Sequence, residues 1–161
     1  MSVAIQTLLY VFREDQLAGR QVLLGRKVRG FGKGLIMAPG GHVEPGESVE
    51  AAAVREAQEE VGITVSESDV DRIAVLTYRF PSRPELDAVV HAFSARQWSG
   101  EVASSDELDP VWFSVSELPL DEMWDDERYW LARALAGERL IAEFVFDAAG
   151  TRVLDSTFGA L

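Results

Sequence analysis

Cysteine is absent from the chain of 161 residues, which excludes disulfide bonds and thiol chemistry. Histidine is nearly absent as well: His42 and His91 lie too far apart in the sequence to indicate a site, and we expect both to be structural. No apolar stretch approaches the length of a membrane span. The first apolar segment, "MSVAIQTLLYVFRED", follows no positively charged region and is interrupted by Gln6, so it predicts a strand rather than a signal peptide. We therefore expect a cytoplasmic protein that contacts no membrane.

Basic residues are scarce too. The 15 Lys and Arg residues face 27 Asp and Glu residues, which leaves a net charge of −12. This balance disfavours binding to a nucleic-acid polymer, because phosphate neutralisation by Lys and Arg dominates that affinity. It does not exclude a small anionic ligand, since metal ions held by acids can receive phosphates. The loop "RKVRGFGKG" gathers basic residues among glycines, and it is either a solvated hairpin loop or a phosphate contact.

The chain has the composition of one domain. No internal repeat, low-complexity tract or linker rich in Pro or Ser divides it, and 47% hydrophobic residues are enough for one substantial core. We expect a single domain over residues 1–161. Apolar and β-branched runs broken by turn residues predict strands near 5–12, 21–26, 73–80, 88–97, 111–113 and 140–146. A second helix is expected over 126–135, ended by Gly137. Strands on both sides of one strong helix indicate an α/β protein with a mixed sheet between helices.

The strongest local prediction is a helix over 49–61. Ser48 is a suitable N-cap, Glu50 lies where the helix dipole favours an acid, and Gly62 provides a left-handed stop. At 100° per residue, one stripe of this helix continues from small apolar residues into glutamates, and Arg55 and Gln58 point elsewhere. The stripe consists of Val49, Ala52, Ala53, Glu56, Glu59 and Glu60.

Three acids on such a stripe repel one another unless a cation lies between them. The first interpretation is a solvated acidic face, because glutamate is a good helix former and is mostly exposed. The alternative is a site for a hard divalent ion, magnesium or manganese, because all the donors are carboxylate oxygens with no nearby His or Cys. The convergence of the acids on one stripe favours the ion.

These residues match a known pattern. Gly41, five residues, Glu47, seven residues, Arg55-Glu56, two residues, Glu59-Glu60, one residue and Gly62-Ile63 resemble the complete Nudix box. Ala57 departs from the pattern, in which a larger aliphatic residue is usual. The resemblance implies the Nudix fold, an α/β/α sandwich with a mixed β-sheet, and a hydrolase that needs Mg²⁺ or Mn²⁺.

The resemblance also implies roles for the residues of the box. Glu56, Arg55 and Glu59 form the implied catalytic group. Glu47 and Gly41 hold that group in position without contacting the substrate, and Arg55 pairs with Glu47 or with a catalytic glutamate. The implied metal ligands are Gly40 through its carbonyl, Glu56, Glu59, Glu60 and Glu107. Glu56 is the preferred general base, and Glu107 is the runner-up or an extra ligand. The ion would orient water for in-line attack on the β-phosphorus, which yields a nucleoside monophosphate and pyrophosphate.

A second set of segments narrows the resemblance to the MutT-homologue branch of the family, the oxidised purine nucleoside triphosphatases. These segments are "LLGRKVRGFGKG", "SSDELDPVWF", "MWDDERYW" and "TRVLDSTF". In that branch a tryptophan stacks on the purine and two acids bond its edge. Trp124, Asp126 and Glu127 occupy these positions, although "DDE" can also simply open the second helix. Further expected substrate contacts are Thr7, Lys27, Phe31 and Tyr78.

One departure bears on the choice of base. Met37 stands where the branch has an asparagine that bonds the base, and Ala38-Pro39 replaces Gly-Phe. Losing an amide from a buried polar site alters base discrimination.

The expected protein is a monomeric magnesium-dependent hydrolase of small nucleotides that clears oxidised purine nucleoside triphosphates such as 8-oxo-dGTP from the nucleotide pool. The alternatives are another Nudix substrate, namely a dinucleotide polyphosphate, ADP-ribose or an unmodified nucleotide, and a non-catalytic binding module. The intact Arg55, Glu56, Glu59 and Glu60 disfavour the binding module.

Overall fold

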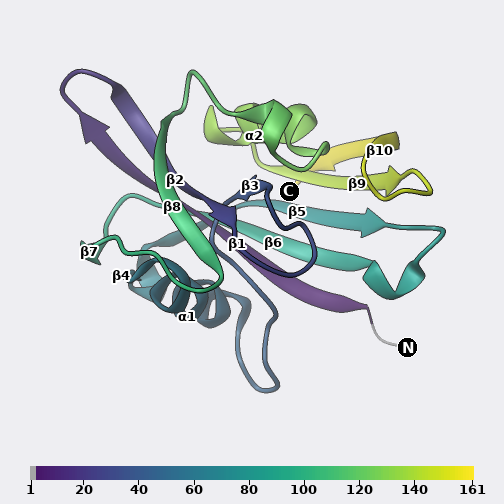
Figure 1. Ribbon diagram of the computed structural model, residues 1–161, viewed down its shortest axis with the longest axis horizontal. Coiled ribbons are helices and arrows are strands. Elements are labelled where there is room, and N and C mark those ends of the chain that lie inside the picture. Colours follow the sequence, from purple (N-terminus) through teal and green to yellow (C-terminus); the bar gives the residue numbers. More distant parts are fainter. Residues whose placement is uncertain (1–2) are drawn as a thin grey trace.

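The computed structural model describes residues 3–161, in which ten β-strands and two α-helices are joined by loops and short 3₁₀ turns (Figure 1). The helices are α1 (Val49–Val61) and α2 (Glu127–Leu135). The longer strands are β1 (Ala4–Asp15), β2 (Gly19–Lys27), β5 (Val70–Arg79), β6 (Ala88–Ala95), β8 (Leu108–Ser114), β9 (Leu140–Phe146) and β10 (Val153–Ala160). The two-residue strands are β3 (Ile36–Met37), β4 (Ile63–Thr64) and β7 (Ser99–Gly100).

The main sheet is mixed, as predicted. Its strand order is β10-β9-β5-β6-β1-β2-β3, and β8 also pairs with β2. The pairs β1–β6 and β5–β9 are parallel, and the remaining pairs of this sheet are antiparallel. Strand β4, which directly follows α1, forms a small separate pair with β7. Because β1 lies between β2 and β6, it passes through the middle of the sheet, where both of its faces are covered.

Alternation along β1 sends side chains into two hydrophobic cores, one on each face of the sheet. Leu9 and Val11 belong to the core that includes Ala53 and Ala57 of α1. Tyr10 and Phe12 belong to the opposite core, which includes Trp130 and Leu131 of α2. The sheet therefore lies between the two helices (Figure 1), and the predicted α/β/α sandwich is confirmed.

The six predicted strands are all present, with boundaries that differ by a few residues. The predictions missed β3, β4, β7 and β10. The first three are two residues long, too short for any periodic signal. Strand β10 forms the edge of the sheet next to β9, and most of its side chains are exposed on both faces, so its sequence lacks the alternation of a half-buried strand. The second helix begins at Glu127 rather than at residue 126.

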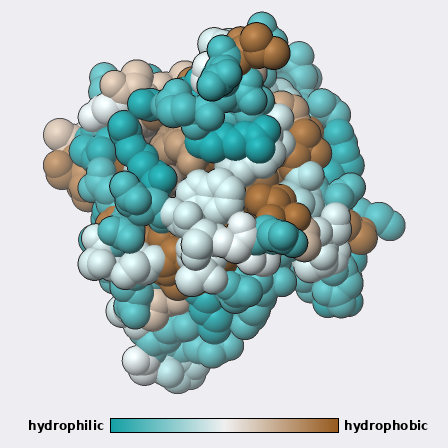
Figure 2. Space-filling model, turned by 90° about the vertical axis from the view of Figure 1, so that its left-hand side faces the viewer, coloured by the Kyte–Doolittle hydropathy of each residue, from teal (hydrophilic) through white to brown (hydrophobic). Residues whose placement is uncertain are grey.

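The surface agrees with the charge balance. The face shown in Figure 2 is mostly hydrophilic, and its hydrophobic patches are small and separated from one another. Among residues 3–161, no helix is long and apolar enough to cross a membrane.

Candidate active site

Helix α1 begins and ends as its sequence predicts. The Ser48 hydroxyl accepts the backbone N–H of Ala51 at 3.0 Å, which satisfies a donor that the first turn leaves free. Gly62 ends the helix with φ of 79°, and its N–H bonds the carbonyl of Gln58. These local caps fix where the helix begins and ends, and the packing of Ala53 and Ala57 against Leu9 and Val11 fixes which face meets the sheet.

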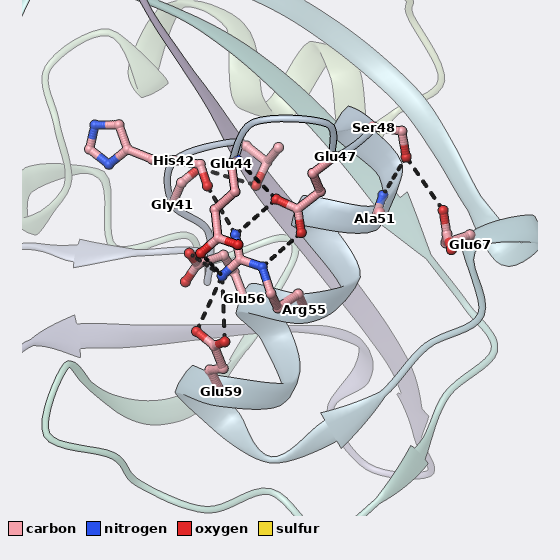
Figure 3. A network of polar contacts seen from close by, with 11 residues as sticks. Gly41, His42, Glu44, Glu47, Ser48, Ala51, Arg55, Glu56, Glu59 and Glu67 are labelled. Carbon is pink, nitrogen blue, oxygen red and sulfur yellow. Dashed lines mark hydrogen bonds and ion pairs between the residues drawn. The ribbon is translucent and has the colours of Figure 1, made fainter.

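Arg55 is the centre of the polar network on α1 (Figure 3). Its Nε and Nη2 donate to both carboxylate oxygens of Glu47, at 2.8 and 3.0 Å. Its Nη1 donates to Glu56 at 3.0 Å and to Glu59 at 3.3 Å. This double contact with the Arg55 guanidinium holds the pKa of Glu47 at about 2, well below its ordinary value, because the paired carboxylate is stabilised as an anion. The predicted pairing of Arg55 is confirmed, and with both kinds of partner at once.

Two details of the predicted stripe are wrong. Arg55 does not point away from the acids, because its long side chain reaches across the helix surface to Glu56 and Glu59. Glu59 does not continue the buried stripe: its side chain is 58% exposed, whereas Ala57 and Glu60 are buried. The sequence spacing correctly places the acids near one another, but it does not describe how far a guanidinium can reach.

Glu60 is the buried acid of the box and lies against the loop that contains Gly40 and Gly41, called the glycine loop below. Its Oε1 accepts the Gly40 N–H at 2.8 Å, and the residue is 8% exposed. Burial raises the pKa of Glu60 to about 7, and the nearby charge of Glu56 adds to the rise. Burial likewise raises the pKa of Glu56 above its ordinary value, against the lowering effect of Arg55.

Other atoms approach both loop glycines closely, but only Gly40 meets another backbone, so only Gly40 is required to be glycine. A Cβ on Gly40 would collide with the backbone carbonyl of Thr7 in β1, and one on Gly41 would lie 2.5 Å from Oε1 of Glu56. Thr7 is buried, and its N–H donates to the Gly41 carbonyl at 2.9 Å. The loop is thus held between β1 and α1, with its backbone against the carboxylates.

Glu107 lies in a basic setting. It accepts hydrogen bonds from Arg29 at 2.6 and 2.9 Å and forms an ion pair with Lys27 at 3.7 Å. The Arg29 guanidinium holds the pKa of Glu107 below its ordinary value. Over the described range of the chain, no group of three or more Asp, Glu, His or Cys side chains converges closely enough to hold a metal ion. The ion site therefore stays a prediction, and arginines engage three of its predicted ligands, Glu56, Glu59 and Glu107.

A cavity of about 440 Å³ joins the box to the second half of the chain. At one end its wall contains Lys27, Gly40, Gly41 and Glu60, together with Thr7. At the other end it contains Phe31, Met37, Tyr78, Trp124, Asp126 and Glu127. The structure thus brings the predicted base-contacting residues and part of the box to one cavity.

Two adjacent buried acids lie at the far end of the cavity. Asp126 is 1% exposed and Glu127 is 2% exposed. Oδ2 of Asp126 accepts the Tyr78 hydroxyl and the Trp130 indole N–H, both at 2.8 Å. Oε1 of Glu127 accepts the Tyr10 hydroxyl at 3.2 Å. Burial raises the pKa of Asp126 to about 6 and raises that of Glu127 well above its ordinary value.

The contacts of Asp126 and Glu127 show whether these acids serve only to begin helix α2. Asp126 occupies the N-cap position of α2, but its side chain makes no capping hydrogen bond within the described chain. Both acids instead turn into the interior, where tyrosine and tryptophan donate to them. Burying two carboxyls is costly unless they are paired, and a helix start does not require it. The Asp126 side chain therefore does not act as the cap of α2.

Aromatic side chains surround the same end. The rings of Phe31 and Trp124 are tilted with centroids 5.0 Å apart, and Phe31 is 50% exposed. Gly32 lies beside them with φ of 87°, and a Cβ there would lie 3.1 Å from Trp124 and 3.4 Å from the Met37 methyl. Met37 thus borders Trp124 at a position with no strong hydrogen-bonding group.

Sequence reasoning missed two residues of this end. Tyr10 and Trp130 are fully buried and look like ordinary core residues in apolar segments. A signal was present, because a tyrosine within the run "LLYVF" must find a partner for its hydroxyl once it is buried. That partner, Glu127, is 117 residues away in the sequence, so the pair is visible only in the fold.

Comparison with protein families agrees with the geometry. The family model of the NUDIX domain matches residues 5–134. The chain belongs to the Nudix family. The match includes α1 with its caps, the glycine loop and nearly all of α2.

Known relatives cover most of this Nudix chain. The oxidized purine nucleoside triphosphate hydrolase of Danio rerio is 40% identical over 126 residues, which are 78% of this chain and 79% of the relative. The protein of the same name from Mus musculus is 36% identical over 135 residues, or 84% and 85% of the two chains. The NAD-capped RNA hydrolase NudC of Pseudomonas aeruginosa is 39% identical over 103 residues, but these are only 34% of that protein. The chain is a Nudix hydrolase homologous to the oxidized purine nucleoside triphosphate hydrolases.

Solved Nudix structures share the fold. The MutT protein of Bacillus halodurans superposes with a TM-score of 0.79 at 24% identity and covers 97% of both chains. The NUDIX domain of Shewanella oneidensis NrtR, solved with ADP ribose, has a TM-score of 0.68 at 15% identity and covers 84% of this chain and 88% of that one. The predicted fold class is confirmed by both likenesses.

Proposed function

We propose that this Nudix hydrolase converts oxidised purine nucleoside triphosphates, such as 8-oxo-dGTP, to the monophosphate and pyrophosphate. The observation that carries the proposal is the cavity, because its wall contains both the glycines of the box and the Trp124, Asp126 and Glu127 group. A nucleotide has a flat base at one end and phosphates at the other. The cavity wall offers the aromatic Trp124 for the base, and Lys27 and the glycines of the box for the phosphates. The two relatives named for oxidised purine nucleotides support the choice of base.

The base end is equipped for a purine. Trp124 and Phe31 provide aromatic surface for stacking, which is worth roughly 1–3 kcal/mol per base but tolerates any base. Asp126 and Glu127 supply hydrogen-bonding groups in a buried setting, where an unmatched polar group is costly. Stacking therefore gives affinity, and the acids give discrimination.

The phosphate end fits a hard divalent cation. Glu56 and Glu60 are largely buried, and burial raises both of their pKa values, so the site favours a nearby positive charge. The donors are carboxylate and backbone oxygens, which suit Mg²⁺. Glu56, Glu59 and Glu60, with the Gly40 carbonyl, would hold the ion. When bound, such an ion neutralises phosphate charge and increases the acidity of water.

The protein's own groups divide the remaining work. Lys27 lines the cavity beside the box and can bind a phosphate oxygen. Glu56 accepts a proton from the attacking water, the new P–O bond forms at the β-phosphorus, and the bond to the α-phosphate oxygen breaks. Glu107 is a weaker candidate for the base, because Arg29 holds the pKa of its carboxyl below the ordinary value, whereas burial raises the pKa of Glu56. Arg55 positions Glu56 through Nη1.

The decisive experiment is a panel of kcat/KM values measured with magnesium. The panel contains 8-oxo-dGTP, dGTP, ADP-ribose and a dinucleotide polyphosphate. We expect 8-oxo-dGTP to be preferred over dGTP by at least about tenfold, because a matched polar site rejects an unmatched edge by 1–3 kcal/mol or more. Equal or better turnover of ADP-ribose or the dinucleotide would overturn the proposal, and no turnover of any compound would favour the non-catalytic alternative.

A further inference from the structure

Two polar side chains meet at the wall of the cavity, away from the buried acids. Gln6 of β1 and His42, which directly follows the glycine loop, form an isolated antiparallel bridge. Beside this bridge the Val43 N–H donates to the Ile5 carbonyl at 3.0 Å. Nε2 of Gln6 lies 3.3 Å from Nε2 of His42, and both residues line the cavity. The backbone of β1 and of the loop therefore holds this pair in place.

The atoms of this pair determine what it can bind. The amide N–H of Gln6 can only donate, so Nε2 of His42 accepts and the imidazole carries its proton on Nδ1. Oε1 of Gln6 is then left to accept a hydrogen bond, and Nδ1 of His42 is left to donate one. In the described chain neither of these two atoms makes another hydrogen bond. The pair thus offers one acceptor and one donor without a formal charge.

The sequence alone indicates a structural role for His42, but its ring is not needed to hold its own segment. Nη2 of Arg55 donates to the His42 carbonyl at 3.1 Å, and the bridge to β1 holds the backbone on the other side. In Figure 3 the ring points away from the carboxylates around Arg55. A hydrogen bond between two accessible side chains contributes little to stability, because water competes for both groups. The pair is therefore available to a ligand in the cavity.

A donor beside an acceptor suits the sugar of a nucleotide. In the proposed function, Trp124 meets the base, and Lys27 and the glycine loop meet the phosphates. A phosphate calls for positive charge, which this pair lacks, whereas every sugar hydroxyl both donates and accepts. His42 directly follows Gly41 in the chain, so the pair lies beside the proposed phosphate site. The sugar is the part of a nucleotide that is bonded directly to the phosphates.

We propose that Gln6 and His42 bind the sugar hydroxyls and make the enzyme prefer oxidised purine ribonucleoside triphosphates to their 2′-deoxy counterparts. The proposal rests on the proposed function, which assigns the base and the phosphates to other residues of the same cavity. A ribose presents two adjacent hydroxyls, so one can donate to Oε1 of Gln6 while the other accepts from Nδ1 of His42. A 2′-deoxyribose lacks one of them and leaves one protein group without a partner. The 2′-hydroxyl is the group by which a protein distinguishes ribonucleotides from deoxyribonucleotides.

The test is the ratio of kcat/KM for 8-oxo-GTP to kcat/KM for 8-oxo-dGTP, measured with magnesium. In the wild type this ratio should be at least about threefold, the effect of one additional hydrogen bond. Gln6→Met and His42→Leu roughly keep the size of each side chain and remove its polar atoms, so both variants should bring the two substrates close to equality. His42→Asn keeps an N–H near the position of Nδ1 and should retain more of the preference than His42→Leu.

Gln21→Met is the matched control for the loss of a glutamine. Gln21 is on β2, where its Oε1 accepts the Arg13 Nε–H at 2.7 Å, and it lies outside the cavity wall. Its replacement should leave the preference for 8-oxo-GTP unchanged. Thermal melting of each variant verifies that it is folded.

A second readout needs no turnover. Nitrogen-15 NMR of the imidazole groups, recorded on the wild type without metal, should show the His42 resonance shifting when 8-oxo-GMP is added. The chain has one other histidine, His91 on β6, which lies outside the cavity wall and whose resonance serves as an internal reference. At equal occupancy 8-oxo-dGMP should shift the His42 resonance less than 8-oxo-GMP, because it has one hydroxyl fewer.

Three results would overturn the assignment. In the first, the wild type hydrolyses both substrates equally well or prefers the deoxyribonucleotide. In the second, Gln6→Met and His42→Leu lower kcat/KM for both substrates in parallel and leave the ratio unchanged, as purely structural residues predict. In the third, 8-oxo-GMP and 8-oxo-dGMP shift the His42 resonance equally or not at all. If neither oxidised nucleotide is hydrolysed, the proposed function is wrong, and the His42 shifts with GMP and dGMP decide whether the pair distinguishes the sugars.

Discussion

A stacked ring and a buried acid act on different parts of a bound nucleotide, and single substitutions can separate them. In the proposed binding mode, Trp124 offers a flat surface that every purine can use, whereas Asp126 meets only the edge of the base. Trp124 borders Phe31 and the Met37 methyl, so its surroundings are apolar. Asp126 is held by Tyr78 and Trp130 in the interior, where its orientation is restricted.

The first prediction compares Trp124→Ala with Asp126→Asn. Trp124→Ala should weaken 8-oxo-dGTP and dGTP to a similar degree, because stacking tolerates any base. Asp126→Asn should lower kcat/KM for 8-oxo-dGTP relative to dGTP by about tenfold or more, since a mismatched group in a buried site costs on the order of 1–3 kcal/mol. The measurement is kcat/KM for both nucleotides with the wild type and both variants. An unchanged ratio in Asp126→Asn would show that this acid does not read the base.

The second prediction concerns the general base. Glu56→Gln should fold normally and lose at least about a hundredfold in kcat, the usual lower range for a general base. Glu107→Gln is the matched control, because Glu107 is more exposed and already paired with Arg29. The loss of kcat in Glu107→Gln should be smaller than in Glu56→Gln. The measurement is kcat at saturating magnesium together with a melting curve, and near wild-type turnover of a folded Glu56→Gln would reject this role.

At the scale of elements, the glycine loop depends on its fit between β1 and α1. Gly40 lies where a Cβ would strike the Thr7 carbonyl, and its N–H anchors the Glu60 carboxylate. Neither contact involves a positive φ, so the requirement for glycine is spatial. Moving the loop would move the acids of α1 with it.

The third prediction follows from this fit. Gly40→Ala should lower the free energy of unfolding by roughly 1–3 kcal/mol or more, because overpacking forces the backbone to shift. Gly159→Ala in β10 is the control, since its Cβ would meet nothing within 4 Å and its φ is not positive. Urea unfolding of both variants measures the difference. Equal midpoints would mean that the loop moves freely away from β1.

The contrast between α1 and β10 explains which elements a sequence can reveal. Ser48, Gly62 and the periodic alanines are local signals that determine α1 before any partner is considered. Strand β10 forms because its backbone pairs with that of β9. Its apolar residues Leu154 and Phe158 are exposed and do not give its sequence the alternation of a half-buried strand. The strands that cross the centre of the sheet were predictable because both faces are buried and their sequences are almost continuously apolar.

The site likewise contains residues that the local sequence reveals and residues that only the fold brings together. The box is contiguous in the chain, so its residues were identified together, although the reach of Arg55 was not. The pairing of Tyr10 with Glu127 and of Tyr78 with Asp126 joins three elements distant in sequence. A hydroxyl within a core strand shows that a partner is needed, but only the sheet order shows which partner it has.

At the scale of the whole molecule, acids in excess make stability depend on pH and on cations. The net charge is −12, and several carboxyls are buried rather than spread over the surface. Burial raises the pKa of Glu60 to about 7 and that of Asp126 to about 6, so the folded state binds protons more tightly than the unfolded chain. Their contribution to stability is therefore largest at low pH and is lost as pH rises through these values.

Glu47 acts in the opposite direction. Its pKa is about 2 because Arg55 holds the anion, so its stabilisation is present above the ordinary value near pH 4.5 and is lost as pH falls through 2. Between about pH 5 and 8, Glu47 is ionised in both states and contributes no slope. In that window Glu60, Asp126 and Glu127, whose pKa values are all raised by burial, dominate the pH dependence. The melting temperature in EDTA should therefore fall by several degrees as pH rises.

The last prediction joins metal and pH. A magnesium ion held by Glu60 and its neighbours should raise the melting temperature through binding to the native state, by roughly 5 °C or more at saturation. The rise should be larger near pH about 8 than near pH about 5, because a proton on Glu60 competes with the ion. Melting curves in EDTA and in magnesium chloride at both values measure it, with potassium chloride of equal ionic strength as the control. Glu60→Gln should remove most of the difference between the two pH values. An equal rise at both pH values in the wild type, or one reproduced by potassium, would mean that these carboxylates screen charge without binding an ion.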